Sequence, residues 1–131
     1  MMRILIADDH LVIRNGLKFL ISSAFPGIEF GETGNGVEAI RLLQESEWTM
    51  LLLDIDMPGI SGFDVLKYLQ SEGVGVPVLV FSFHREEQII LRAFEMGASA
   101  YVTKDAGADL ITAIRRILIG KRNTIFREGQ Q

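Results

Sequence analysis

Short apolar segments alternate along the chain with segments whose apolar residues recur every three or four positions. Three of the short segments are almost wholly apolar, which is typical of strands covered on both faces of a parallel sheet. The predicted strands are Arg3–Asp8, Ile28–Thr33, Met50–Asp54, Val76–Ser82 and Ala100–Thr103. This pattern favours a parallel sheet buried between two layers.

Helical periodicity occupies the intervals between these strands. Apolar stripes run from Ile13 to Ala24, from Gly62 to Leu69 and from Ile111 to Leu118. Two further helices are predicted at Val37–Glu45 and Glu86–Met96. Five strand–helix repeats predict a doubly wound α/β domain, because each crossover between parallel strands is right-handed and about one helix long.

Residues at the helix ends agree with this interpretation. Capping patterns precede two predicted helices, namely Ser61 with Asp64 and Asn35 with Glu38. Gly97 and Gly120 stand where helix C-caps are expected. Periodicity ends there, so Lys121–Gln131 is predicted to be a tail or linker stub.

Composition narrows the class of protein. A chain of 131 residues with 48% apolar residues predicts one domain with a core that needs no disulfide or structural metal. The net charge of -4 argues against a general nucleic-acid binder. The absence of cysteine excludes thiol catalysis and iron–sulfur clusters, and it fits a cytoplasmic protein. The apolar segments are shorter than a membrane span of about 20 residues or a signal-peptide core of about 7–15.

Polar side chains stand at the carboxyl ends of the predicted strands, where the functional crevice of such a sheet lies. They are Asp8, Asp9, Asp54, Ser82 and Lys104. Two ionised carboxylates about 4 Å apart repel by about 4 kcal/mol at an effective dielectric near 20. The three acidic residues must therefore hold a cation, raise a pKa or lower stability.

The residue types at this edge point to one kind of chemistry. Carboxylate oxygens with few other ligands suit Mg²⁺, and a hydroxyl and an ammonium group suit a phosphoryl group. We therefore predict Mg²⁺-assisted phosphoryl transfer onto or past a carboxylate. Taken singly, Asp8 or Asp9 would be a helix cap and Asp54 a turn residue, so the prediction rests on their combination.

The segment Leu51–Gly62, preceded by Ile4–His10 and followed by Ser82 and Lys104, resembles the receiver domain of two-component response regulators. The resemblance covers about residues 3–120. It implies a flavodoxin-like (βα)5 fold with strand order 2-1-3-4-5. Residues 1–120 are then the receiver domain, and 121–131 a tail or a linker stub toward a missing output domain.

The resemblance implies a phosphoacceptor and a metal site. Asp54 would accept phosphate from a sensor histidine kinase in a Mg²⁺-dependent reaction. Asp8 or Asp9, chiefly Asp9, would bind Mg²⁺ together with Asp54. The backbone carbonyl of Ile55 would complete the protein ligands.

The resemblance also implies a switch beside that site. Lys104 would pair with the phosphate, Ser82 would turn inward to bond it, and Tyr101 would be the aromatic switch residue, or else an ordinary residue of an edge strand. Asp56 and His84 are candidates for tuning the reaction rates at the rim, and the alternative is that both are ordinary loop residues.

Further motifs resemble the NarL/FixJ-type subgroup, whose members carry a LuxR-type helix-turn-helix output domain. They are Asp8–His10, Arg14–Leu17, Gly97–Lys104 and Ile117–Arg122. The resemblance implies a transcription regulator that contacts DNA only through the output domain. It also implies a homodimer, formed through the fourth helix, fifth strand and fifth helix or through the first and fifth helices. Catalysis would be limited to the domain's own phosphorylation and dephosphorylation.

Two residues depart from the family pattern. Asp105 replaces the proline common after Lys104, and we expect it to cap the last helix. Phe83 places a bulky ring beside the phosphate pocket.

Two other functions stay open. One alternative to a phosphorylated receiver domain is a receiver-fold interaction module that works without phosphate. The other is a phosphatase of the haloacid-dehalogenase type, whose nucleophile strand resembles Leu51–Asp56.

Overall fold

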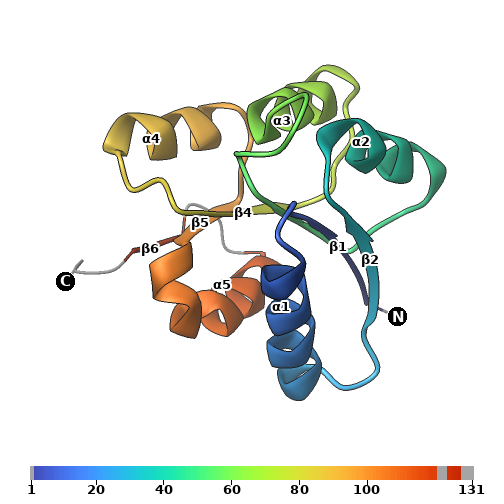
Figure 1. The fold of residues 1–131 in the computed structure, drawn as a ribbon, viewed down its shortest axis with the longest axis vertical. Helices are drawn as coiled ribbons and strands as arrows, with labels where there is room; N and C mark the ends of the chain where they lie inside the picture. The colour runs from blue at the N-terminus through green and yellow to red at the C-terminus, as the bar shows by residue number, and fades with distance from the viewer. Residues whose placement is uncertain (1, 121–123, 128–131) are drawn as a thin grey trace.

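The computed structural model describes residues 2–120 and 124–127. Its centre is one parallel sheet with strand order β2-β1-β3-β4-β5-β6 (Figure 1). The strands are β1 Arg3–Ala7, β2 Glu29–Thr33, β3 Met50–Leu53, β4 Val78–Ser82, β5 Ala100–Thr103 and β6 Thr124–Phe126. The order 2-1-3-4-5 expected for the first five strands is confirmed, and each of their ends lies within two residues of its predicted position.

Helices cover both faces of the sheet, with α1 and α5 on one side and α2, α3 and α4 on the other (Figure 1). They are α1 Leu11–Ala24, α2 Gly36–Glu45, α3 Gly62–Ser71, α4 Glu87–Glu95 and α5 Leu110–Leu118, with a 3-10 helix η1 at Lys104–Asp109. None of the helices in the described ranges is long and apolar enough to cross a membrane.

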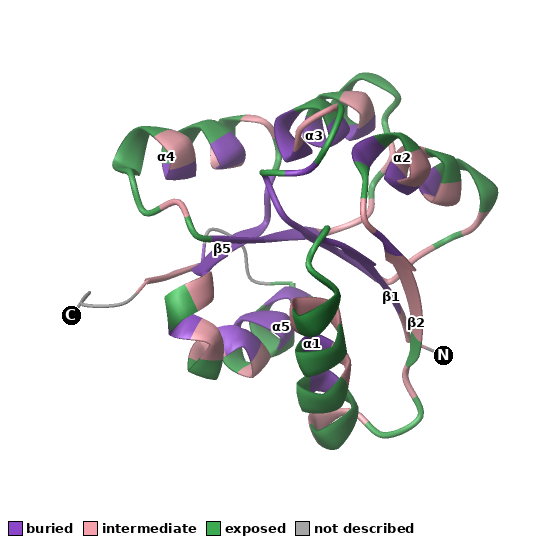
Figure 2. Cartoon of the chain, in the orientation of Figure 1, coloured by how far each residue is buried: buried purple, intermediate pink, exposed green. Residues whose placement is uncertain are grey.

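The core is divided by the sheet into two apolar layers. Every residue of β3 and β4 is buried, as their continuous apolar sequences predict (Figure 2). Leu17 and Ile21 of α1 pack with the buried face of α5 in one layer. Phe63 and Leu66 of α3 pack with α2 and α4 in the other. The polar ends of the strands therefore lie at the edge of a rigid, fully packed sheet.

The predicted helix ends are confirmed. Ser61 and Asp64 form a reciprocal capping box at α3, and the Asn35 side chain accepts the Glu38 amide at α2. Gly97 follows the end of α4 with a φ of 101°, a left-handed conformation that favours glycine. Gly62 is required by close packing, because a Cβ there would lie 2.5 Å from the carbonyl oxygen of Asp54.

The predicted tail contains a short strand, because Thr124–Phe126 form β6 and pair in parallel with β5. The assignment of 121–131 as a tail or linker stub stays a prediction. Three residues are too few to show a strand period in the sequence, and the pairing depends on the open backbone edge of β5. The other residues of the predicted tail, except Arg127, lie outside the described residues.

The expected capping role of Asp105 is also wrong. Asp105 lies in the first turn of η1, and α5 begins later, after Asp109. The Asp105 carboxylate accepts hydrogen bonds from the Thr103 hydroxyl and the Arg85 guanidinium. Its position therefore ties the start of η1 to the loop between β4 and α4.

Candidate phosphoryl-transfer and metal site

The two central carboxylates are brought together by the pairing of β1 with β3. Ala7 lies opposite Leu53 in the register, so the next residues, Asp8 and Asp54, leave the sheet side by side. The Asp54 amide donates to the Ala7 carbonyl at 2.9 Å and continues this pairing by one residue. The side chains of Asp8 and Asp54 are each only 3% exposed.

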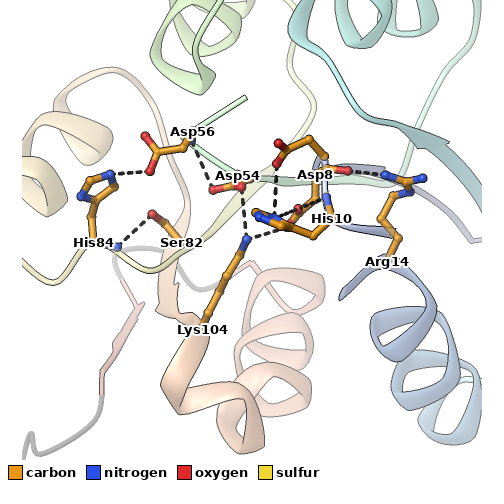
Figure 3. A network of polar contacts seen from close by, with 9 residues as sticks. Asp8, His10, Arg14, Asp54, Asp56, Ser82, His84 and Lys104 are labelled. Carbon is orange, nitrogen blue, oxygen red and sulfur yellow. Dashed lines mark hydrogen bonds and ion pairs between the residues drawn. The ribbon is translucent and has the colours of Figure 1, made fainter. Parts of the chain in front are cut away.

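Lys104, the first residue after β5, places its ammonium group between these carboxylates (Figure 3). Its Nζ lies 2.8 Å from Asp8 Oδ2 and 3.1 Å from Asp54 Oδ2, and the lysine side chain is 2% exposed. One buried ammonium group therefore pairs with two buried carboxylates. The centre carries a net negative charge, which favours a further cation there.

Burial raises the pKa of Asp54 above its usual range, and the nearby Asp8 carboxylate adds to the shift. Lys104 acts in the opposite direction, through both its charge and its hydrogen bond. The burial cost therefore exceeds the benefit of an ammonium group that Asp54 shares with Asp8.

His10 is a member of this cluster that the sequence analysis named only as part of the motif Asp8–His10. Its Nδ1 lies 2.8 Å from Asp8 Oδ1 and 3.2 Å from Asp9 Oδ1. The Arg14 guanidinium, one turn into α1, donates to the backbone carbonyl of Asp8 at 2.6 Å. The sequence feature that could have identified His10 is its position directly after two acidic residues, in the short turn between β1 and α1.

The acidic cluster fits a hard divalent cation. Asp8, Asp9, His10 and Asp54 each offer one ligand atom, and these atoms lie within 4.8 Å of one another. Opposite ligands of a single Mg²⁺ ion are about 4.2 Å apart, because each metal–oxygen distance is about 2.1 Å. The Ile55 carbonyl, expected to be a further ligand, already accepts the Gly62 amide at 2.8 Å, and its part in the site stays a prediction.

The predicted switch residues lie together on the neighbouring strands. Ser82 and Tyr101 are fully buried, so Tyr101 is not exposed at a sheet edge. The Tyr101 hydroxyl donates to the His84 carbonyl at 2.8 Å, while the Ser82 Oγ accepts the His84 amide at 3.1 Å. Burial raises the pKa of Tyr101 to about 12, although a hydrogen bond with Ser82 partly opposes the shift.

The two candidate rim residues are in direct contact. His84 Nε2 lies 2.7 Å from Asp56 Oδ2 (Figure 3). His84 Nδ1 lies 3.2 Å from Glu86 Oε2. The Asp56 amide donates to Asp54 Oδ1 at 3.3 Å. This bridge therefore joins the loop after β3 to the loop after β4 beside the Asp54 carboxylate.

Phe83 is an exposed residue that lies against Lys104. Its side chain is 63% exposed, and the ring centroid is 4.9 Å from the Lys104 ammonium, a distance suitable for a cation–π contact. The ring therefore rests over the ammonium group that pairs with Asp54.

Comparison with known proteins identifies the family. The response regulator receiver domain matches residues 4–115. The glycerol metabolism activator of Pseudomonas putida is 37% identical over 122 residues, which cover 92% of this chain and 55% of that protein. The nitrate/nitrite response regulator protein NarL of Escherichia coli strain K12 is 34% identical over 119 residues, or 90% of this chain and 55% of that protein.

A solved structure agrees with these relatives. The crystal structure of a two-component response regulator of the LuxR family from Aurantimonas sp. SI85-9A1 has a TM-score of 0.85 and 35% sequence identity. The match covers 92% of this chain and 86% of that one. The chain spans about half the length of the curated relatives it matches. It belongs to the response-regulator receiver-domain family, with relatives of the NarL/LuxR type.

Proposed function

We propose that Asp54 is the phosphoacceptor of this receiver domain. The observation that carries the proposal is the buried Asp54 carboxylate, which shares the Lys104 ammonium with Asp8 at the carboxyl edge of the sheet. Asp8, Asp9 and Asp54, with His10 as a further donor, would hold Mg²⁺. The bound ion supplies positive charge that offsets the repulsion between the carboxylates and the incoming phosphoryl oxygens.

The reaction is a transfer between two side chains. A carboxylate oxygen of Asp54 attacks the phosphorus of a phosphohistidine, the P–N bond breaks, and its electron pair stays on the imidazole nitrogen. Lys104 then pairs with a phosphoryl oxygen, since its ammonium already lies 3.1 Å from Asp54. The Ser82 hydroxyl would turn from the His84 amide to the phosphoryl group.

Intact mass after incubation with acetyl phosphate tests this proposal. We expect one phosphoryl group on the wild-type chain, dependent on Mg²⁺, and none on Asp54→Asn. Asp109→Asn is the matched control, because this aspartate makes no capping hydrogen bond and lies outside the site. Wild-type protein that binds Mg²⁺ without gaining an adduct would contradict the proposal and favour the phosphate-independent module.

The His84–Asp56 bridge is proposed to limit the access of water to the phosphorylated site. We expect His84→Ala to shorten the lifetime of the phosphorylated state severalfold, because the imidazole lies across the rim beside Asp54. Loss of the mass adduct with time measures that lifetime. An unchanged lifetime would leave His84 as an ordinary loop residue.

The domain is proposed to act in a cytoplasmic transcription regulator, with a sensor histidine kinase as phosphodonor. Its relatives are named as transcriptional regulatory or response regulator proteins, and the chain spans about half of their length. DNA contact would belong to an output domain, and homodimerisation to the receiver surface. The phosphatase alternative finds no support, because the family match is to receiver domains and Asp54 follows the third strand.

A further inference from the structure

The C-terminal segment of the described chain packs against the switch residue. Thr124, Ile125 and Phe126 pair with Ala100, Tyr101 and Val102 of β5, so Ile125 lies directly beside Tyr101. Ile125 is partly buried in the same apolar layer that contains the Tyr101 ring. Side chains of paired residues in a parallel sheet lie on the same face, about 4.8 Å apart.

Two other contacts fix this segment to the domain. The Arg116 guanidinium of α5 lies 5.8 Å from the centre of the Phe126 ring. Arg127 Nη1 donates to the Arg85 carbonyl at 3.3 Å, and Arg85 follows His84, whose carbonyl accepts the Tyr101 hydroxyl. The segment therefore contacts both the strand that carries Tyr101 and the loop whose carbonyl accepts the Tyr101 hydroxyl.

We propose that residues 124–127 are a docking strand that closes over Tyr101 and couples its buried position to phosphorylation of Asp54. A Tyr101 ring leaving the core toward the sheet edge would meet Ile125, so the docked strand favours the inward ring. The inward ring in turn keeps the His84 carbonyl in place, with the adjacent His84 amide on Ser82. Docking of residues 124–127 and the arrangement of the phosphate pocket therefore depend on the same two-state element, the position of the Tyr101 ring.

Thermodynamic reciprocity gives this proposal a measurable form. If phosphorylation strengthens docking of the strand, then docking must strengthen binding of a phosphoryl mimic by the same factor. The inference rests on the proposed role of Asp54, but the two can fail separately. Beryllofluoride, which forms a phosphoryl-like adduct on a carboxylate, is a suitable probe with Mg²⁺.

Hydrogen exchange of the amides of residues 124–127 tests the coupling. We expect beryllofluoride to slow their exchange by about fivefold or more, the low end for coupled sites. Ile125→Ser should speed this exchange and weaken beryllofluoride binding by a similar factor, whereas Ile125→Val should restore most of both. Val37→Ser is the matched control, because Val37 is 66% exposed on α2, far from β5 (Figure 1).

The outcomes separate the two proposals. A beryllofluoride adduct that leaves exchange at 124–127 unchanged, or an Ile125→Ser variant that binds the probe like the wild type, would overturn the docking strand alone. If Asp54 forms no adduct with either beryllofluoride or acetyl phosphate, the proposed function fails, and the coupling fails with it.

Discussion

Two carboxylates of this domain each face a lysine, yet their pKa values shift in opposite directions. Glu32 on β2 lies 2.7 Å from Lys18 and 3.0 Å from Arg14, and the hydrogen bond from Lys18 is the main cause of its lowered pKa. Asp54 lies 3.1 Å from Lys104, and burial raises its pKa. The Glu32 side chain is 31% exposed, whereas that of Asp54 is 3% exposed.

The regions around Glu32 and Asp54 differ in their ratio of cationic to anionic groups as well as in burial. Glu32 forms ion pairs with two cationic side chains, whereas Asp54 shares one ammonium with Asp8. The first arrangement satisfies its charges and contributes modestly to stability. The second leaves buried negative charge in excess, which is unfavourable for folding alone but suits a site that takes up a cation and a phosphoryl group.

The largest expected effect is that of Lys104→Met. Removing the ammonium leaves two buried carboxylates without their shared cation, so we expect a loss of about 3 kcal/mol in the free energy of unfolding. Lys18→Met is the matched control and should cost less than about 1 kcal/mol, because Glu32 keeps Arg14 and partial contact with water. Urea denaturation without Mg²⁺ measures both. Equal losses would contradict the contrast between the two regions.

A smaller effect of opposite sign is expected for Asp54→Asn. This variant removes one buried negative charge, so at neutral pH without Mg²⁺ we expect Tm to rise by a few degrees, as about 1 kcal/mol would produce. Because the pKa of Asp54 is raised, its neutral form favours the folded state. That stability is fully present below the usual carboxyl pKa and is lost as pH rises through the raised value.

The advantage of Asp54→Asn should therefore shrink as the pH is lowered toward the usual carboxyl range. Thermal unfolding at several pH values measures it, with Asp109→Asn as the control. A Tm below that of the wild type at neutral pH would show that the pairing with Lys104 outweighs burial.

The smallest effect is expected for Glu32→Gln. The loss should be less than about 1 kcal/mol, because the ion pairs are partly exposed and screened by salt. The pKa of Glu32 is lowered, so its stabilising contribution is present above the usual glutamate pKa and is lost as pH falls through the lowered value. Denaturation at low and high salt measures this loss, and a loss independent of salt would contradict a partly exposed ion pair.

The sequence predicted which polar residues come together in the site, because the carboxyl ends of strands in a parallel sheet meet at one edge. Asp8 and Asp54 each follow an apolar strand, and the register of β1 with β3 places them together. His10 was not predicted as a site residue, since its contact with Asp8 depends on the turn before α1. Asp105 was expected to cap α5, but the intervening η1 helix is invisible to helical periodicity.

The five strand–helix repeats could be predicted from side-chain periodicity, which is local along the chain. The acidic and basic residues at the strand ends could then be read directly from the sequence. The order of the strands in the sheet was implied only by the resemblance to receiver domains. Tertiary packing alone sets the upward shift of the Asp54 pKa, the His84–Asp56 bridge and the docking of β6 beside Tyr101. Each depends on the exclusion of water or on distances between residues far apart in the chain, which packing of the whole domain sets.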